Sequence, residues 1–169
     1  DLRGAGLHGR IAGHQHGPIL ALQGEHDCGH GYRSWSWDLQ KTDQRIEAGF
    51  RAAGDTNTNL PTTLIGYSQG ALLVEALAAK YPDKYKRIIS IGSPRVAAAE
   101  SLGRLEGAVM MAGTYDNRAI MKEGMAALLR RRIPSTFIEI PNARHSQLLE
   151  GERVMGEALN WLDANQKGS

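Results

Sequence analysis

Residues 66–70, Gly-Tyr-Ser-Gln-Gly, place a serine between two glycines in the pattern Gly-x-Ser-x-Gly. The residues before the serine, 62–67, are β-branched and apolar, which is typical of a buried strand, and residues 69–81 have the composition of a strong helix. A serine on such a sharp strand-to-helix turn is exposed at the strand end, beside a helix N-terminus that favours developing negative charge. The pattern predicts that Ser68 is a nucleophile, and a structural glycine turn is the alternative.

A serine hydroxyl needs a neighbouring base before it becomes a good nucleophile. His145 is the only histidine that follows Ser68 in the chain, and it comes five residues after the strand-like run 136–140. In sites built on this turn the partners follow the serine in the order acid, then histidine. We therefore predict that His145 is the base.

The acid of such a site should also follow a strand. Asp116 comes four residues after the apolar run 108–112, whereas Asp83 follows a helix and should lie at the opposite edge of the sheet. No acidic residue directly follows the run 87–91. Asp116 is therefore the predicted acid, although an aspartate at this position also suits the N-terminus of the next helix.

Two backbone N–H groups are needed to stabilise the oxyanion of an acyl-transfer reaction. The residue after the nucleophile, Gln69, is expected to supply one of them. The second should follow an early strand, and the glycine turns before Arg10 and before Glu25 both offer a donor. The residues themselves leave this choice open.

Residues 1 to about 36 are rich in histidine and glycine. Its potential metal ligands are His14, His16, His26, Asp27, Cys28 and His30. No paired Cys-x-x-Cys or His-Glu-x-x-His pattern accompanies them, so we expect glycine-rich turns and neither a metal nor another cofactor. Trp35 and Trp37 have strand-like spacing, and they suit either a pocket wall or packing beneath a loop.

Short apolar runs alternate with helical patterns along the rest of the chain. Strands are expected over residues 18–23, 62–67, 87–91, 108–112 and 136–140, and helices over 43–53, 69–81, 96–105, 118–131 and 147–164. This alternation predicts an α/β fold, a three-layer sandwich with a mostly parallel central sheet. Ligands bind such sheets at the carboxyl ends of the strands, where the three candidate residues are expected.

The composition fits one ordinary globular domain over residues 1–169. The net charge of +2 gives no reason to expect a nucleic acid or an anionic membrane as a partner, and no apolar run reaches membrane-spanning length. A lone cysteine cannot form an internal disulfide, so the fold does not depend on an oxidising compartment. We expect a soluble monomer or homodimer, cytoplasmic or secreted.

These motifs together resemble the α/β-hydrolase superfamily, and within it the small, lidless carboxylesterases and lysophospholipases. The resemblance is carried by residues 7–9, Gly24, 34–37, 66–70, 113–116 and 141–145. It implies a Ser68–Asp116–His145 triad and an oxyanion hole formed by Gln69 and Arg10. It also implies substrate contacts by His8, Gly9, Tyr67, Trp35 and Trp37, and a fold that is reduced at its N-terminus.

The resemblance implies hydrolysis of small carboxylic esters through an acyl-enzyme intermediate, with a small-molecule ester as the partner. Residues 91–107 leave room for one short helix only, so we expect no lid. Thioesterase or peptidase chemistry with the same triad is one alternative. A non-catalytic binding domain on a hydrolase scaffold is a second, and a metal-linked role for the histidine-rich N-terminal segment is a third.

Overall fold

The computed structural model describes residues 19–23, 26–27, 32–33, 36–52, 62–145 and 147–165. Their central sheet has five parallel strands in the order β1-β4-β5-β6-β7. The strands are β1 (Ile19–Gln23), β4 (Thr62–Tyr67), β5 (Tyr85–Ile91), β6 (Gly107–Gly113) and β7 (Ser135–Ile140). A separate antiparallel pair, which the sequence pattern did not predict, joins β2 (His26–Asp27) to β3 (Tyr32–Arg33).

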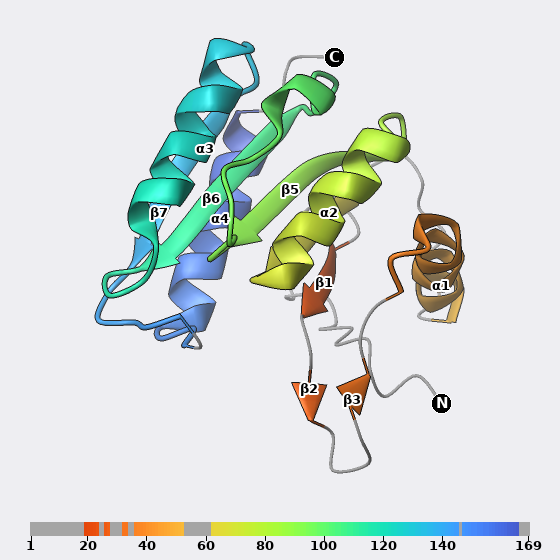
Figure 1. The fold of residues 1–169 in the computed structure, drawn as a ribbon, viewed down its shortest axis with the longest axis horizontal. Coiled ribbons are helices and arrows are strands. Elements are labelled where there is room, and N and C mark those ends of the chain that lie inside the picture. The colour runs from red at the N-terminus through yellow and green to blue at the C-terminus, as the bar shows by residue number, and fades with distance from the viewer. Residues whose placement is uncertain are drawn as a thin grey trace.

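Helices cover both faces of this sheet (Figure 1). They are α1 (Leu39–Ala52), α2 (Gln69–Lys80), α3 (Arg118–Arg130) and α4 (Gly151–Ala164). The first three contribute to the hydrophobic cluster on one face, and α4 packs on the other. The predicted three-layer α/β sandwich is confirmed, with a central sheet that is entirely parallel among the described strands.

Consecutive residues of the central strands fill the two layers of the core in turn. Ile88 and Met110 pack in the cluster that includes α2 and α3, whereas Ile89 and Met111 pack against α4. All four side chains are fully buried, and complete burial of one such side chain contributes about 1.5–3 kcal/mol. Strands held on both faces in this way give a rigid platform for the loops at their carboxyl ends.

The predicted helix over residues 96–105 is wrong. The connection between β5 and β6 contains only a three-residue 3-10 turn, η1 (Ala99–Ser101). Ala97, Ala99, Leu102 and Leu105 are nevertheless all buried in the core. Their spacing resembles that of a helix because an irregular segment packs its apolar side chains against the same cluster as α3.

Two helices also start at a different residue from the one predicted, each for a local reason. Helix α1 begins at Leu39, earlier than expected, because Asp38 Oδ1 accepts hydrogen bonds from two amides of its first turn at 3.1 and 3.2 Å. Helix α4 begins only at Gly151, because Glu150 adopts the left-handed conformation with φ 51°. No helix in the described ranges is both long and apolar enough to cross a membrane.

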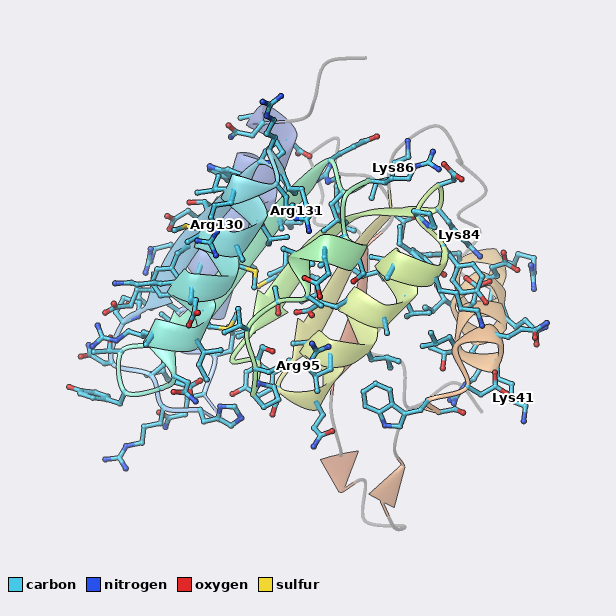
Figure 2. The ribbon with its side chains drawn as sticks, turned by 45° about the horizontal axis from the view of Figure 1, so that its top comes forward. Lys41, Lys84, Lys86, Arg95, Arg130 and Arg131 are labelled. Atoms are coloured by element: carbon cyan, nitrogen blue, oxygen red, sulfur yellow. The ribbon has the colours of Figure 1, made fainter. Side chains whose placement is uncertain are left out.

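A buried carboxyl group ties α2 to the β5–β6 connection. Glu75 is 2% exposed, and its Oε2 lies 3.5 Å from the Ala98 amide and 3.7 Å from Arg95 Nη2. Figure 2 shows Arg95 beside α2. Burial raises the pKa of Glu75 to about 7, and the positive charge of Arg95 only partly opposes this effect.

This raised pKa predicts that the wild-type protein loses stability relative to Glu75→Gln as pH rises. The unfolded chain ionises Glu75 near pH 4.5, whereas the folded chain resists ionisation until about pH 7. Each pKa unit corresponds to about 1.4 kcal/mol, so the difference between the two free energies of unfolding should change by about 3 kcal/mol across this window. Urea unfolding at about pH 4.5 and about pH 8 measures it. Exposed Glu123→Gln is the control, and parallel stability profiles for wild type and Glu75→Gln would contradict the prediction.

Candidate active site

Ser68 occupies a strained turn between β4 and α2. Its φ of 52° and ψ of −116° are unfavourable for a residue with a side chain, and its amide donates a 2.8 Å hydrogen bond to the Ile91 carbonyl. A Cβ atom on Gly66 would lie 2.3 Å from the carbonyl oxygen of Gly70. The glycine at position 66 is therefore required by close backbone approach, and the turn presents the serine at the carboxyl edge of the sheet.

His145 lies between the serine and the acid. Its Nε2 is 2.9 Å from Ser68 Oγ, and its Nδ1 is 3.0 Å from both carboxylate oxygens of Asp116. When Nδ1 carries the proton and donates to the carboxylate, Nε2 has a free lone pair that accepts the serine proton. The structure thus brings the three predicted residues into one continuous hydrogen-bonded line.

The Asp116 carboxylate is 9% exposed and is held by its own backbone turn. Besides contacting the imidazole, Oδ1 accepts the Asn117 amide at 2.7 Å. The N-cap position of α3 belongs to Asn117, which makes no side-chain capping bond. The rejected candidate, Asp83, forms an exposed ion pair with Arg104 instead. Asp116 therefore stabilises its local turn while it contacts the histidine, and it does not occupy the capping position itself.

Backbone hydrogen bonds join the loops that carry the acid and the histidine. The Thr114 amide donates to the Ile140 carbonyl, and the Tyr115 amide donates to the Ala143 carbonyl, both at 3.0 Å. These bonds continue the pairing of β6 with β7 beyond the ends of the strands. The separation of the acid and the histidine is therefore set by the sheet as well as by their own side chains.

Gly92, which the sequence analysis did not single out, completes the wall beside this line. It follows the last residue of β5 and has φ +57°. A Cβ atom here would lie 2.9 Å from Asp116 Oδ2 and 3.2 Å from His145 Cε1. The signal in the sequence was a glycine directly after a predicted strand, at the edge where ligands bind.

Gly92→Ala is expected to yield a folded protein with at least about 100-fold lower turnover of a substrate. The new methyl group must displace the carboxylate or the imidazole, and a misplacement of about 1 Å costs activity of this order. The positive φ should lower the free energy of unfolding by only about 1–2 kcal/mol. Steady-state kinetics and urea unfolding separate these effects. Gly103→Ala is the matched control, because its added Cβ meets no atom within 4 Å; equal activity of both variants would contradict the expectation.

Three further predicted site residues fall within the described part of the chain. Gln69 is exposed and begins α2, where the first N–H groups of a helix have no partner inside that helix. The Tyr67 and His145 rings have centroids 5.6 Å apart. Trp37 is 58% exposed, so it does not pack in the core.

The other candidates lie outside the described residues. They are the predicted oxyanion donor Arg10, its competitor Glu25, and the predicted substrate contacts His8, Gly9 and Trp35. The same holds for His14, His16, Cys28 and His30, while His26 and Asp27 are described only as β2. Across the ranges that the structure does describe, no three histidine, cysteine or acidic side chains group together as metal ligands would.

No family model and no curated protein matches the chain. Solved structures do match it. A predicted CIB-like hydrolase from Thermoplasma acidophilum is 18% identical with a TM-score of 0.56; the match covers 76% of this chain and 61% of that one. Dienelactone hydrolase from Anabaena variabilis ATCC 29413 is 17% identical with a TM-score of 0.56, covering 90% and 88%.

Monoacylglycerol lipase from Paleococcus ferrophilus is 13% identical with a TM-score of 0.56, covering 89% of this chain and 97% of that one. The chain thus spans nearly all of two of these proteins and about three fifths of the Thermoplasma protein. At such low identity the similarity establishes a shared fold, and the chemistry must be argued from the residues themselves.

Proposed function

We propose that this chain, which has the α/β-hydrolase fold, is a serine hydrolase that cleaves small carboxylic esters. The observation that carries the proposal is the hydrogen-bonded line from Asp116 through His145 to Ser68 at the carboxyl edge of the sheet. The strained φ of the serine supports it further, because such strain persists where the surrounding structure maintains it for a function.

In the proposed reaction Ser68 Oγ attacks the carbonyl carbon of the ester while His145 Nε2 takes the hydroxyl proton. The backbone amide of Gln69 donates to the oxyanion of the tetrahedral intermediate. The intermediate collapses as the imidazolium returns the proton to the leaving alcohol, which leaves an acyl-serine. Water then attacks the acyl group by the same proton transfers, releasing the acid and free Ser68, while Asp116 orients the imidazole and balances its charge.

The preference for small esters follows from the short connection between β5 and β6. Residues 92–106 are all described, and their only regular element is the three-residue turn η1, so this connection supplies no helical lid. The similarity in fold to proteins named as a monoacylglycerol lipase and a dienelactone hydrolase supports hydrolysis. A site that this connection leaves uncovered needs no lipid surface to open it.

A series of p-nitrophenyl esters of increasing acyl length tests this proposal. We expect the highest kcat/KM for the short, soluble esters and no jump in rate when longer esters begin to form micelles. Thioester and amide analogues, assayed in parallel, separate esterase from thioesterase or peptidase chemistry. Activity that appears only at a lipid–water interface would contradict the substrate preference, and no hydrolysis of any compound would favour a binding domain.

A further inference from the structure

The hydrogen bonds of the His145 ring hold two of its atoms, Nδ1 and Nε2, at Asp116 and Ser68. They restrain the tilt of the ring plane less directly than the positions of these two atoms, because the plane also depends on what contacts the ring faces. The side chain is 51% exposed and lies on a loop. Proton transfer needs the Nε2 lone pair to point at the serine, and that direction changes with the ring plane.

Tyr67 supplies an aromatic contact beside this ring. The two centroids lie 5.6 Å apart with the planes tilted by 42°, within the range for favourable aromatic pairs. On the opposite side from solvent, Tyr67 packs against the hydrophobic cluster of β5, β6, β7 and α4. The Tyr67 ring therefore contacts the buried cluster on one side and the imidazole of an exposed loop on the other.

The Tyr67 hydroxyl does not account for the residue's position. The oxygen is buried, and no hydrogen-bond partner for it exists among the described residues. Burial, together with the negative charge of Asp116, raises the pKa of the phenol, so it stays neutral when the site works. A buried hydroxyl without a partner costs about 1–3 kcal/mol, which makes the ring the useful part of the side chain.

We propose that Tyr67 is a positioning residue whose ring fixes the plane of the His145 imidazole. The inference rests on the proposed function, because an imidazole needs this orientation only when it transfers a proton. It differs from the substrate contact expected for Tyr67 from the sequence resemblance. A substrate contact would affect KM, whereas a positioning role affects kcat.

Three variants separate the ring from the hydroxyl and from stability. Tyr67→Leu removes the ring, and Tyr67→Phe keeps the ring and removes the unpartnered oxygen. Tyr81→Leu is the matched control: Tyr81 is also half-buried and also meets an aromatic ring, that of Tyr85, but it lies at the other end of α2 from Ser68. The readouts are kcat and KM for p-nitrophenyl acetate and the thermal midpoint of each variant.

We expect Tyr67→Leu to lower kcat by about 10- to 100-fold with KM within about threefold of wild type. Tyr67→Phe should keep kcat within about threefold and unfold at the same or a higher temperature. Tyr81→Leu should lose stability without losing kcat. The inference is overturned if Tyr67→Leu retains kcat, if it changes KM alone, or if Tyr67→Phe loses as much activity as Tyr67→Leu.

An activity-independent readout separates this inference from the proposed function. In the Ser68→Ala background, the nuclear magnetic resonance signals of the His145 ring protons report the neighbouring aromatic ring and the order of the imidazole. Removing the Tyr67 ring should shift and broaden these signals, and Tyr67→Phe should preserve them. Unchanged signals in the leucine variant overturn the inference. Changed signals, together with a wild-type protein that retains Ser68 and hydrolyses no ester, overturn only the proposed function.

Discussion

Ser68→Ala is expected to lower the turnover of a short-chain p-nitrophenyl ester by at least about 1000-fold while the protein stays folded. Under the proposed mechanism the substitution removes the atom that forms the acyl-enzyme bond, and loss of a triad nucleophile costs this much or more in a serine protease. The positive φ of Ser68 is as unfavourable for alanine as for serine, so stability should change little. The residual rate should be that of direct attack by water on the bound ester, helped only by the oxyanion donors.

The control for this variant is an exposed serine in the connection between β5 and β6. Ser101→Ala removes an exposed hydroxyl of η1, which bonds only the Ala98 carbonyl, and it should leave kcat unchanged. Circular dichroism and thermal unfolding show whether both variants fold. A loss of less than about tenfold in Ser68→Ala, with both proteins folded, would mean that the serine is not the nucleophile.

Asp116→Asn should lower kcat by about 10⁴-fold, the size of effect seen when a triad aspartate is replaced by its isosteric amide. The carboxylate accepts a hydrogen bond from the protonated His145 Nδ1, which leaves the Nε2 lone pair free to act as the base. An asparagine amide instead donates to Nδ1, which favours the tautomer with its proton on Nε2. That tautomer cannot take the proton of the serine.

A matched aspartate separates this effect from a general loss of charge. Asp83→Asn removes an exposed carboxylate that pairs with Arg104 at the other end of α2, and it should leave kcat unchanged. The asparagine at position 116 can still accept the Asn117 amide, so the turn before α3 should survive. A folded Asp116→Asn protein with nearly normal kcat would contradict the assignment and favour a purely local role for this side chain.

The sequence was sufficient for the layers of the fold and for the three candidate residues because their signals are local. Apolar runs predict the parallel strands, and chain order selects His145 and Asp116 once Ser68 is chosen. Gly92 and the ring of Tyr67 were missed in these roles for the opposite reason. Their importance depends on which side chains approach them from distant loops, and spacing along the chain does not report such contacts.

The helix predicted over residues 96–105 was wrong because the buried apolar side chains of this segment have a helix-like spacing. A helix and an irregular segment bury apolar side chains equally well, so periodicity alone did not distinguish them. The left-handed conformation of Glu150, which delays the start of α4, likewise has no signal in composition. Arg10 stays a prediction for the second oxyanion donor, because it lies outside the described residues.

The most direct test of the central claim is to map the residue that a fluorophosphonate probe modifies. Such probes react only with a serine that is activated by its neighbours, so labelling does not require knowledge of the natural substrate. Mass spectrometry of the digested protein should find one adduct, on Ser68, and Ser68→Ala, Asp116→Asn and His145→Ala should each suppress it. Absence of labelling in the folded wild-type protein, or an adduct on another serine, would contradict the account.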